Sequence, residues 1–405
     1  MADIYSNAHF VLCTSLAEGD SEGFLRPLSV RGSRLLLSLI WKPGYQTRGD
    51  SHLSAPMDTR AWCFQESLLA RRIVAYDESG LRYHCGVYAE GLHDSYGFLQ
   101  DGKWAAFARH RMPNLLIGDH PLTPEDWKII VEEYTSRRLT VPSDRLPALS
   151  GIASTLNRKR EQKYLGGLWA HHLPKNLLWS VVSSGASRNI SLQHSPSFAL
   201  SSVNEKIDVN PAGNSYRLPN FPSMVKTLRA DCFVKGPDPY GHVSWGVLRL
   251  LGSLYTAELF KIPREERWVV SKVHDTRPNG PIHIGREHDE SHQIVSDAQL
   301  VTRSSTNKQT GQTCLCRTYA SEDLGTGETT AWAKLLLVAE EIQEYHSEKK
   351  KKAFFFLVLG PTHPPEGCPD NSLKYQRLGS WTLYNHWDDK SPYKFQRNDQ
   401  EVTIV

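Results

Sequence analysis

The sequence predicts an α+β protein in which a helix and a hairpin come first, a helical segment follows, and a mainly β half ends the chain. Apolar residues recur with helical spacing between residues 60 and 69 and between residues 123 and 156. After about residue 180 the composition shifts to Ser, Asn, Pro and Gly, and separate β-prone runs follow. We therefore expect three domains: 1–90 with the helix and hairpin, 91–180 as a helical segment packed on it, and 181–405 as a mainly β region.

The composition indicates a folded cytoplasmic protein. Its 405 residues are 40% apolar and 22% charged, and 47 basic residues against 44 acidic ones are too even a balance for a nucleic-acid partner. The longest apolar stretches, such as Ala353–Gly360, are less than half of the ~20 residues that a bilayer-spanning helix needs. Residues 1–8 lack the basic leader of a secretory signal, and seven scattered cysteines favour reduced thiols.

The first elements of the chain alternate between helix and strand. Residues 1–8 are typical of the end of a helix, and Phe10–Thr14 predicts a short buried strand because the run is brief, apolar and β-prone. Arg72–Tyr76 and Leu81–Cys85 predict a hairpin, since the Asp77–Gly80 segment between them is a four-residue turn signal that ends in glycine.

A helix is expected over residues 60–69, directly before this hairpin. Its apolar spacing predicts an inner face formed by Trp62, by Gln65 or Glu66, and by Leu69.

Two further helices are expected in the middle of the chain. Thr123 is a capping residue before Pro124, and four apolar residues spaced i, i+3, i+4 and i+7 form one stripe: Trp127, Ile130, Val131 and Tyr134. A second helix is expected to start at Ser143–Asp144, with apolar residues along one side up to Leu156. A third apolar segment, 164–179, is interrupted by a proline.

The second half is expected to be mainly β. Two polar stretches, Val203–Asn220 and Ser296–Gln312, predict long loops. Strands are expected at six β-prone runs: Val247–Leu251, Trp268–Val273, Leu315–Tyr319, Lys334–Val338, Phe354–Leu359 and Trp381–Tyr384.

Ser21 lies in a G-x-S-x-G sequence, the pattern of a hydrolase nucleophile elbow. An elbow needs a strand directly before it and a helix directly after it. Here the preceding strand ends at Thr14 and Pro27 follows closely. A polar surface loop is the better interpretation.

A histidine cluster is the densest group of metal-type ligands, with His283, His288 and His292 close in sequence. The segment reads HDESH rather than HExxH, so Glu290 is one place too late to act as the water-activating base. Cys314 and Cys316 lack a second cysteine pair. We expect solvated loop histidines and no metal, and a metal-dependent hydrolase remains the alternative.

One segment resembles a known family. Asp58–Ile73 (DTRAWCFQESLLARRI) is similar to the R-x-W-x-x-Q-E-x-x-L-S-x-R-I segment of fungal heterokaryon-incompatibility (HET) domain proteins. Residues 1–8 and 83–85 resemble two more blocks of that family, and Tyr134–Ala153 is similar to the segment downstream of the HET core. The residues that match family motifs are Arg60, Trp62, Gln65, Glu66, Arg72, Asp144 and Arg145.

The resemblance implies a remnant of an α/β, TIR-like HET core within residues 1–90. The opening family blocks, S-Y-x-W-G and W-I-D-x-x-C-I-x-Q, would precede Met1 and are absent, which implies a truncated member. The family acts in non-self recognition and programmed cell death in filamentous fungi, so other HET-type proteins are the implied partners. Some TIR domains cleave NAD, but such a catalytic carboxylate is expected in the absent part. We expect a non-catalytic protein without a cofactor, and an NAD-cleaving enzyme is a further alternative.

The motif residues have an architectural interpretation beside a ligand-contacting one. Trp62 would supply a large apolar anchor. Glu66 and Arg72 lie across the predicted helix-to-strand junction, where a charge-assisted hydrogen bond between them would hold the hairpin in place. We expect the architectural role.

Overall fold

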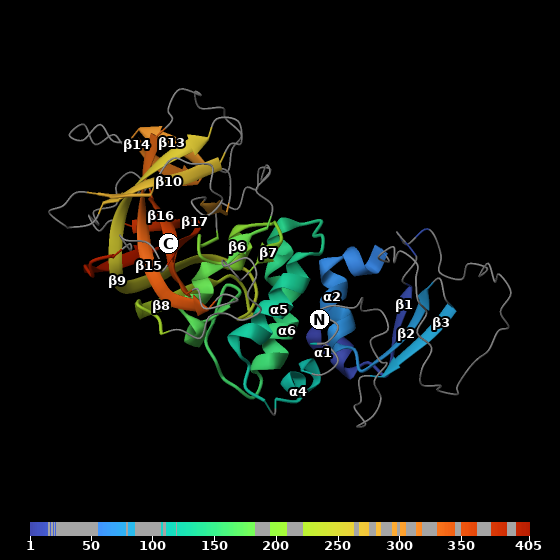
Figure 1. Ribbon diagram of the computed structural model, residues 1–405. Coiled ribbons are helices and arrows are strands. Elements are labelled where there is room, and N and C mark those ends of the chain that lie inside the picture. The colour runs from blue at the N-terminus through green and yellow to red at the C-terminus, as the bar shows by residue number, and fades with distance from the viewer. Residues whose placement is uncertain are drawn as a thin grey trace. The chain divides into compact units, whose positions relative to one another are not determined.

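Figure 1 shows the fold of the chain in a computed structural model. The structure describes residues 1–14, 17, 19, 21, 56–77, 80–85, 107, 111–118, 120–182, 195–208, 222–262, 267–274, 281–284, 294–297, 300–304, 313–317, 330–344, 350–362, 374–386 and 394–405.

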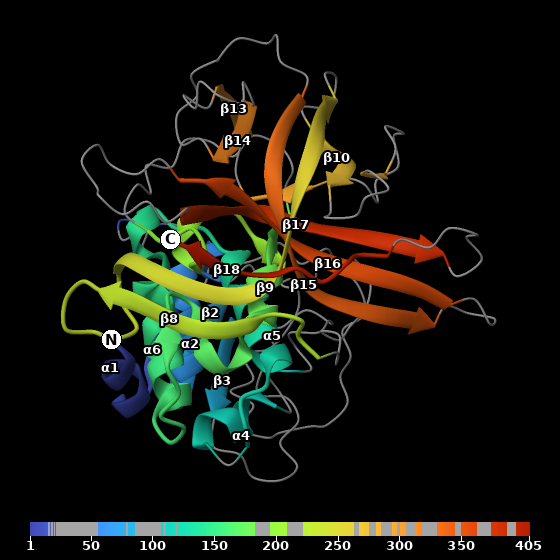
Figure 2. The same ribbon diagram turned by 90° about the vertical axis from the view of Figure 1, so that its left-hand side faces the viewer.

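The chain divides into two compact units. Unit 1 comprises Met1–Pro121 with Arg137–Leu139, and unit 2 comprises Leu122–Ser136 with Thr140–Val405. Neither unit ends at residue 90 or residue 180, the boundaries that the sequence predicts. The expected α+β class with a mainly β second half is confirmed (Figures 1 and 2).

Unit 1 contains a small mixed sheet of three strands in the order β1-β2-β3. β1 pairs in parallel with β2, with Val11 opposite Ile73, and β2 and β3 form the expected antiparallel hairpin. The elements are α1 (Ala2–Asn7), β1 (Val11–Thr14), η2 (Pro56–Thr59), α2 (Ala61–Leu69), β2 (Arg72–Asp77), β3 (Gly80–Cys85) and α4 (Met112–Ile117).

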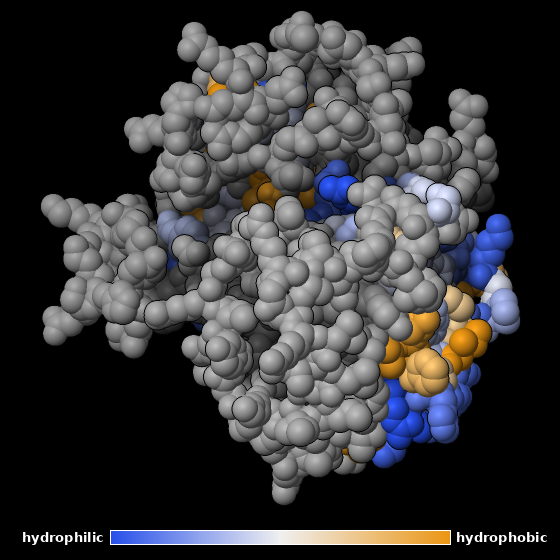
Figure 3. Space-filling view, turned by 90° about the vertical axis from the view of Figure 1, so that its right-hand side faces the viewer, coloured by the Kyte–Doolittle hydropathy of each residue, from blue (hydrophilic) through white to orange (hydrophobic). Residues whose placement is uncertain are grey.

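The prediction that residues 10–14 form a buried strand is wrong in part. β1 forms, but none of its residues is buried, and Leu12 is 47% exposed. The reason is its position, since within the described residues β1 pairs only with β2 and is an edge strand. Ile4 and Phe10 are also exposed, at 66% and 58%. Figure 3 shows a group of hydrophobic residues on the surface of the described part of the molecule.

Helix α5 (Pro124–Thr135) in unit 2 begins as predicted. The Asp126 amide donates to Thr123 Oγ1 at 3.2 Å and the Thr123 amide donates to Asp126 Oδ2 at 2.9 Å, so the two residues form a capping box. The predicted stripe is buried: Trp127, Ile130, Val131 and Tyr134.

The second helix begins later than predicted. Residues Pro142–Arg145 form a 3-10 turn, η3, and α6 runs over Pro147–Asn157. Pro147 has no amide hydrogen to donate to the carbonyl of Ser143, so a continuous α-helix from Ser143 is interrupted at that position.

Short elements occupy the rest of the middle of unit 2, including the apolar segment 164–179. They are β4 (Tyr164–Leu165), β5 (Leu168–Trp169), η4 (Ala170–His172), η5 (Lys175–Leu178), β6 (Ser180–Val181), η6 (Leu200–Ser202) and β7 (Ile207–Asp208).

The second half forms an eleven-stranded sheet. The six predicted runs overlap β9, β10, β14, β15, β16 and β17. The strands are β8 (Lys226–Val234), β9 (Val243–Ile262), β10 (Arg267–His274), β11 (Ile282–His283), β12 (Val295–Ser296), β13 (Leu300–Ser304), β14 (Thr313–Arg317), β15 (Thr330–Glu344), β16 (Lys350–Pro361), β17 (Lys374–His386) and β18 (Asp399–Ile404).

The two stretches that were expected to be loops contain strands. β7 lies in 203–220 and β13 lies in 296–312. Both are short, and each pairs with another strand, β6 for β7 and β14 for β13. Within these two stretches, residues 209–220, 298–299 and 305–312 lie outside the described part of the chain.

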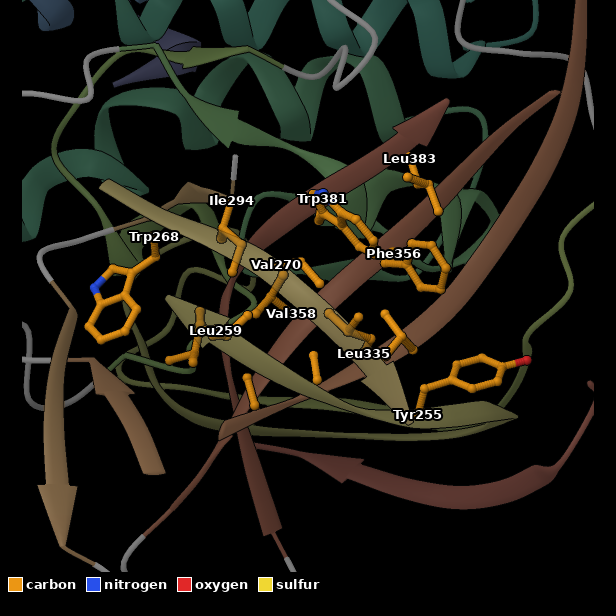
Figure 4. Close-up of a cluster of buried hydrophobic side chains, with 14 of the residues drawn as sticks. Tyr255, Leu259, Trp268, Val270, Ile294, Leu335, Phe356, Val358, Trp381 and Leu383 are labelled. Carbon is orange, nitrogen blue, oxygen red and sulfur yellow. The ribbon is translucent and has the colours of Figure 1, made fainter. Parts of the chain in front are cut away.

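The sheet closes on itself through the long strand β9. The first half of β9 pairs with β8 and β18, and its second half pairs with β10 and β15. The path β9-β18-β17-β16-β15 then returns to β9. Buried side chains from these strands pack together, including Phe356 stacked on Trp381 with ring centroids 5.0 Å apart (Figure 4).

In the described part of the chain, no helix has the length and apolar character needed to cross a membrane.

Candidate functional site

The residues that match the family motif lie on and around α2. The helix buries one face, formed by Ala61, Cys63, Phe64, Gln65, Leu68 and Leu69. Trp62 is only partly buried, so the prediction that it anchors the inner face is wrong. Positions 61, 64, 65 and 68 share one side of a helix at i, i+3, i+4 and i+7, and Trp62 lies beside that side. Phe64 is the aromatic anchor, with 1% of its surface exposed.

Glu66 accepts a hydrogen bond from the hydroxyl of Tyr5 in α1. Burial, followed by the nearby charge of Glu66 and this hydrogen bond, raises the pKa of Tyr5 to about 12. The motif glutamate therefore joins α1 to α2.

Arg72 does not pair with Glu66, contrary to the prediction. Its Nη1 donates instead to the carbonyl oxygen of His9 at 3.3 Å, next to the start of β1. The carboxylate of Glu66 is directed to α1, where it bonds Tyr5. Arg72 thus connects the beginning of β2 to the beginning of β1, the strand that is parallel to it.

Cys63 lies three residues before Glu66 in α2 and carries a thiol, a side chain that can act as a nucleophile in catalysis. It is buried, and this burial, with a smaller contribution from Glu66, raises the pKa of its thiol to about 11. Arg60 and Arg137 oppose the shift but do not overcome it. The side chain is a thiol at neutral pH, whereas a catalytic cysteine needs a lowered pKa.

The start of α2 is held by residues 137–139 of the same unit. The Ala61 amide donates to the Arg138 carbonyl at 3.0 Å, and the Arg138 amide donates to the Thr59 carbonyl at 2.6 Å. The guanidinium of Arg137 lies 4.8 Å from the centroid of the Phe64 ring. Arg60 itself is exposed.

Asp144 and Arg145 belong to unit 2, whereas α2 belongs to unit 1. Arg145 is buried, and its Nη2 donates to the carbonyl of Glu205 at 2.6 Å. Its own carbonyl accepts from the Tyr134 hydroxyl at 2.6 Å, and burial lowers the pKa of its guanidinium to about 10. These bonds tie η3 to α5 and to the segment before β7, which is an architectural role.

The other candidate sites fall largely outside the described residues. His288, Glu290 and His292 lie there, and so do Asp20, Glu22 and Gly23 around Ser21. His283 lies in β11, and Cys314 and Cys316 lie in β14. The described ranges contain no group of three or more histidine, cysteine, aspartate or glutamate side chains placed to hold a metal ion.

Sequence reasoning missed the role of Tyr5. Residues 1–8, which contain it, resemble a family block, but the resemblance predicts no function for any of their side chains. The i, i+4 spacing of Ala61, Gln65 and Leu69 predicts the buried face of α2. The contact between Tyr5 and Glu66 joins residues far apart in the sequence, so no local pattern predicts it.

Comparisons with known proteins add no assignment: no protein-family profile, no curated protein and no solved structure matches this chain.

Proposed function

We propose that this chain is a HET-type protein of filamentous fungi that acts in non-self recognition and cell-death signalling by binding other HET-type proteins, without catalysis of its own. The observation that carries the proposal is the arrangement of the motif segment. Helix α2 is followed closely by β2, and Glu66 in α2 accepts a hydrogen bond from Tyr5 within the same unit.

The sheet of unit 1 supports an α/β core of the proposed, TIR-like kind. Parallel strands need a crossover connection between them, usually through a helix, and α2 lies between the parallel strands β1 and β2 in sequence. Such strands are normally covered on both faces, whereas β1 has no buried residue.

The state of the motif side chains supports a non-catalytic role. Cys63 is a buried protonated thiol, Glu66 is hydrogen-bonded to Tyr5, and Arg72 is bonded to a backbone carbonyl. Each of these groups contributes to the packing of α1, α2 and β2. A nucleophile and an adjacent base, which covalent catalysis requires, do not occur together among them.

The exposed edge of β1 supports a binding role. Within the described residues the strand pairs on one side only, and the apolar side chains of Ile4, Phe10 and Leu12 are exposed nearby in sequence. A partner that adds a strand to this edge would satisfy the backbone groups and cover apolar surface. We propose a HET-type protein as that partner.

The proposal is tested by co-expression in a filamentous fungus with an intact HET-domain protein. The chain is expected to change the growth arrest that the intact protein causes, and Leu12→Lys is expected to abolish this change because a charge is placed at the partner-facing edge. Val182→Lys is the matched control. Like Leu12, Val182 is an exposed aliphatic residue, with 56% of its surface exposed, but it belongs to unit 2. An identical effect of both variants would argue against binding at β1.

A further inference from the structure

The outer face of the β8–β9 pair combines aromatic and cationic side chains in register. Three cross-strand pairs follow one another: Phe233 opposite Trp245, Asp231 opposite Val247, and Arg229 opposite Arg249. In β9 these positions alternate with buried residues, so they form the solvent side of the sheet. Figure 2 shows β8 beside the first half of β9.

The aromatic pair is exposed to an unusual degree for large side chains. Phe233 and Trp245 are 58% and 53% exposed, their ring centroids are 5.9 Å apart and their planes differ by 9°. Two parallel rings of this kind offer an apolar contact for a side chain that packs on them.

The arginine pair lies at the other end of the same face. Four residues at ~3.3 Å each place it about 13 Å from the aromatic pair. Arg229 Nε and Lys163 Nζ share the carboxylate of Asp231, at 2.5 and 2.7 Å, and Arg249 pairs with Glu401. Three cations therefore face two carboxylates, and the two Nη atoms of Arg229 have no partner within the described residues. This end of the face complements an additional acidic group.

β8 also has an open backbone edge. Within the residues that the structure describes, it pairs with β9 alone, so the backbone groups on its other side form no ladder with a described strand. The edge, the aromatic pair and the arginine pair together define an elongated surface rather than a compact pocket.

We propose that this surface binds an extended peptide segment of a partner protein that adds a strand to β8. The segment places an apolar side chain on Phe233 and Trp245 and, four residues along, an acidic side chain against Arg229 and Arg249. The spacing follows from the strand rise, because side chains four residues apart in an extended peptide lie on the same side and span the same distance. This inference rests on unit 2 and does not depend on the proposed function.

The probe is a fluorescently labelled, threonine-rich synthetic peptide with one phenylalanine and a glutamate four residues after it. A second peptide carries glutamine in place of that glutamate. Binding to the full chain is measured by fluorescence anisotropy. The glutamate peptide is expected to bind about fivefold more tightly than the glutamine peptide, as for one partly exposed ion pair.

Variants identify the two ends of the surface. Trp245→Ser is expected to weaken both peptides about tenfold, because it removes the aromatic contact. Arg229→Gln is expected to weaken the glutamate peptide about fivefold and to leave the glutamine peptide unchanged. Val182→Ser, an exposed apolar position elsewhere in unit 2, is the control and should change neither. Phe233→Ser replaces Trp245→Ser if circular dichroism shows that the latter is unfolded.

Three results would overturn the proposal. They are the absence of binding, equal binding of both peptides to the unmodified chain, and tighter binding of an oligothymidylate that is lost in Trp245→Ser. The last result would assign the aromatic pair to stacking on nucleic-acid bases instead.

Discussion

The hydroxyl of Tyr5 donates a hydrogen bond to the carboxylate of Glu66, and this bond joins the N-terminal helix α1 to the motif helix α2. Both residues lie in segments that resemble HET-family blocks. Their contact gives a physical reason for the two residue types to occur together, since removal of either leaves the other without its partner.

Loss of this bond is expected to destabilise unit 1. Glu66→Ala should lower the free energy of unfolding by about 1.5 to 3 kcal/mol, the range for a hydrogen bond to a charged group. Tyr5→Phe should cost a similar amount, and the double variant should cost less than the sum of the two. Urea denaturation measures all three. Additive losses would show that the two side chains do not interact.

Phe64, rather than Trp62, is expected to anchor the motif helix. Phe64→Ala should cost about 3 to 5 kcal/mol because a fully buried aromatic side chain loses its packing. Trp62→Ala should cost less than about 2 kcal/mol, since that side chain is only partly buried. The same denaturation experiment compares them. The reverse order of losses would contradict the observed burial of α2.

His172 is expected to make unit 2 sensitive to acid. Burial, and secondarily the neighbouring His171, lower its pKa to about 4, below the value of about 6.5 for an unfolded chain. The unfolded state therefore binds the proton more tightly, so stability is full above pH ~6.5 and falls as the pH is lowered toward 4. The Tm between pH 4 and 7 measures this fall. His172→Gln should flatten the profile, and the exposed His283→Gln should leave it unchanged.

The buried ion pair of Arg377 and Asp297 is expected to be essential to the large sheet. Both side chains are fully buried, and the Arg377 guanidinium also lies 3.5 Å from the centroid of the Trp179 ring. Asp297→Asn should cost about 3 to 5 kcal/mol because an unpaired charge is left in the interior. Replacing both residues by apolar ones, as in Arg377→Met with Asp297→Leu, should restore part of the loss. A single variant with unchanged thermal stability would show that the pair is solvated.

Local patterns in the sequence predict much of the secondary structure. The capping box at Thr123 and the stripe that follows it involve residues a few positions apart, so they can be seen without tertiary information. The long strands β15, β16 and β17 contain apolar, β-prone runs for the same reason. The later start of α6 could also have been predicted, because it follows from Pro147 alone.

Elements that depend on distant partners could not be predicted in this way. β12 exists because Val295 and Ser296 pair with Ser380 and Gly379, far along the chain. The partners of Glu66 and Arg72 are likewise set by tertiary contacts, with Tyr5 and with the His9 carbonyl. The motif predicts a set of residues, and only the tertiary structure shows what Glu66 and Arg72 contact.

The most direct test of the account measures growth arrest in a filamentous fungus that expresses this chain with and without an intact HET-domain protein, together with NAD cleavage by the purified chain. We predict no arrest by the chain alone, no NAD cleavage, and an altered arrest in the presence of the intact protein that Leu12→Lys abolishes. Arrest by the chain alone that is lost in Glu66→Ala without loss of stability, accompanied by NAD cleavage, would contradict the account and place an active enzyme within these residues.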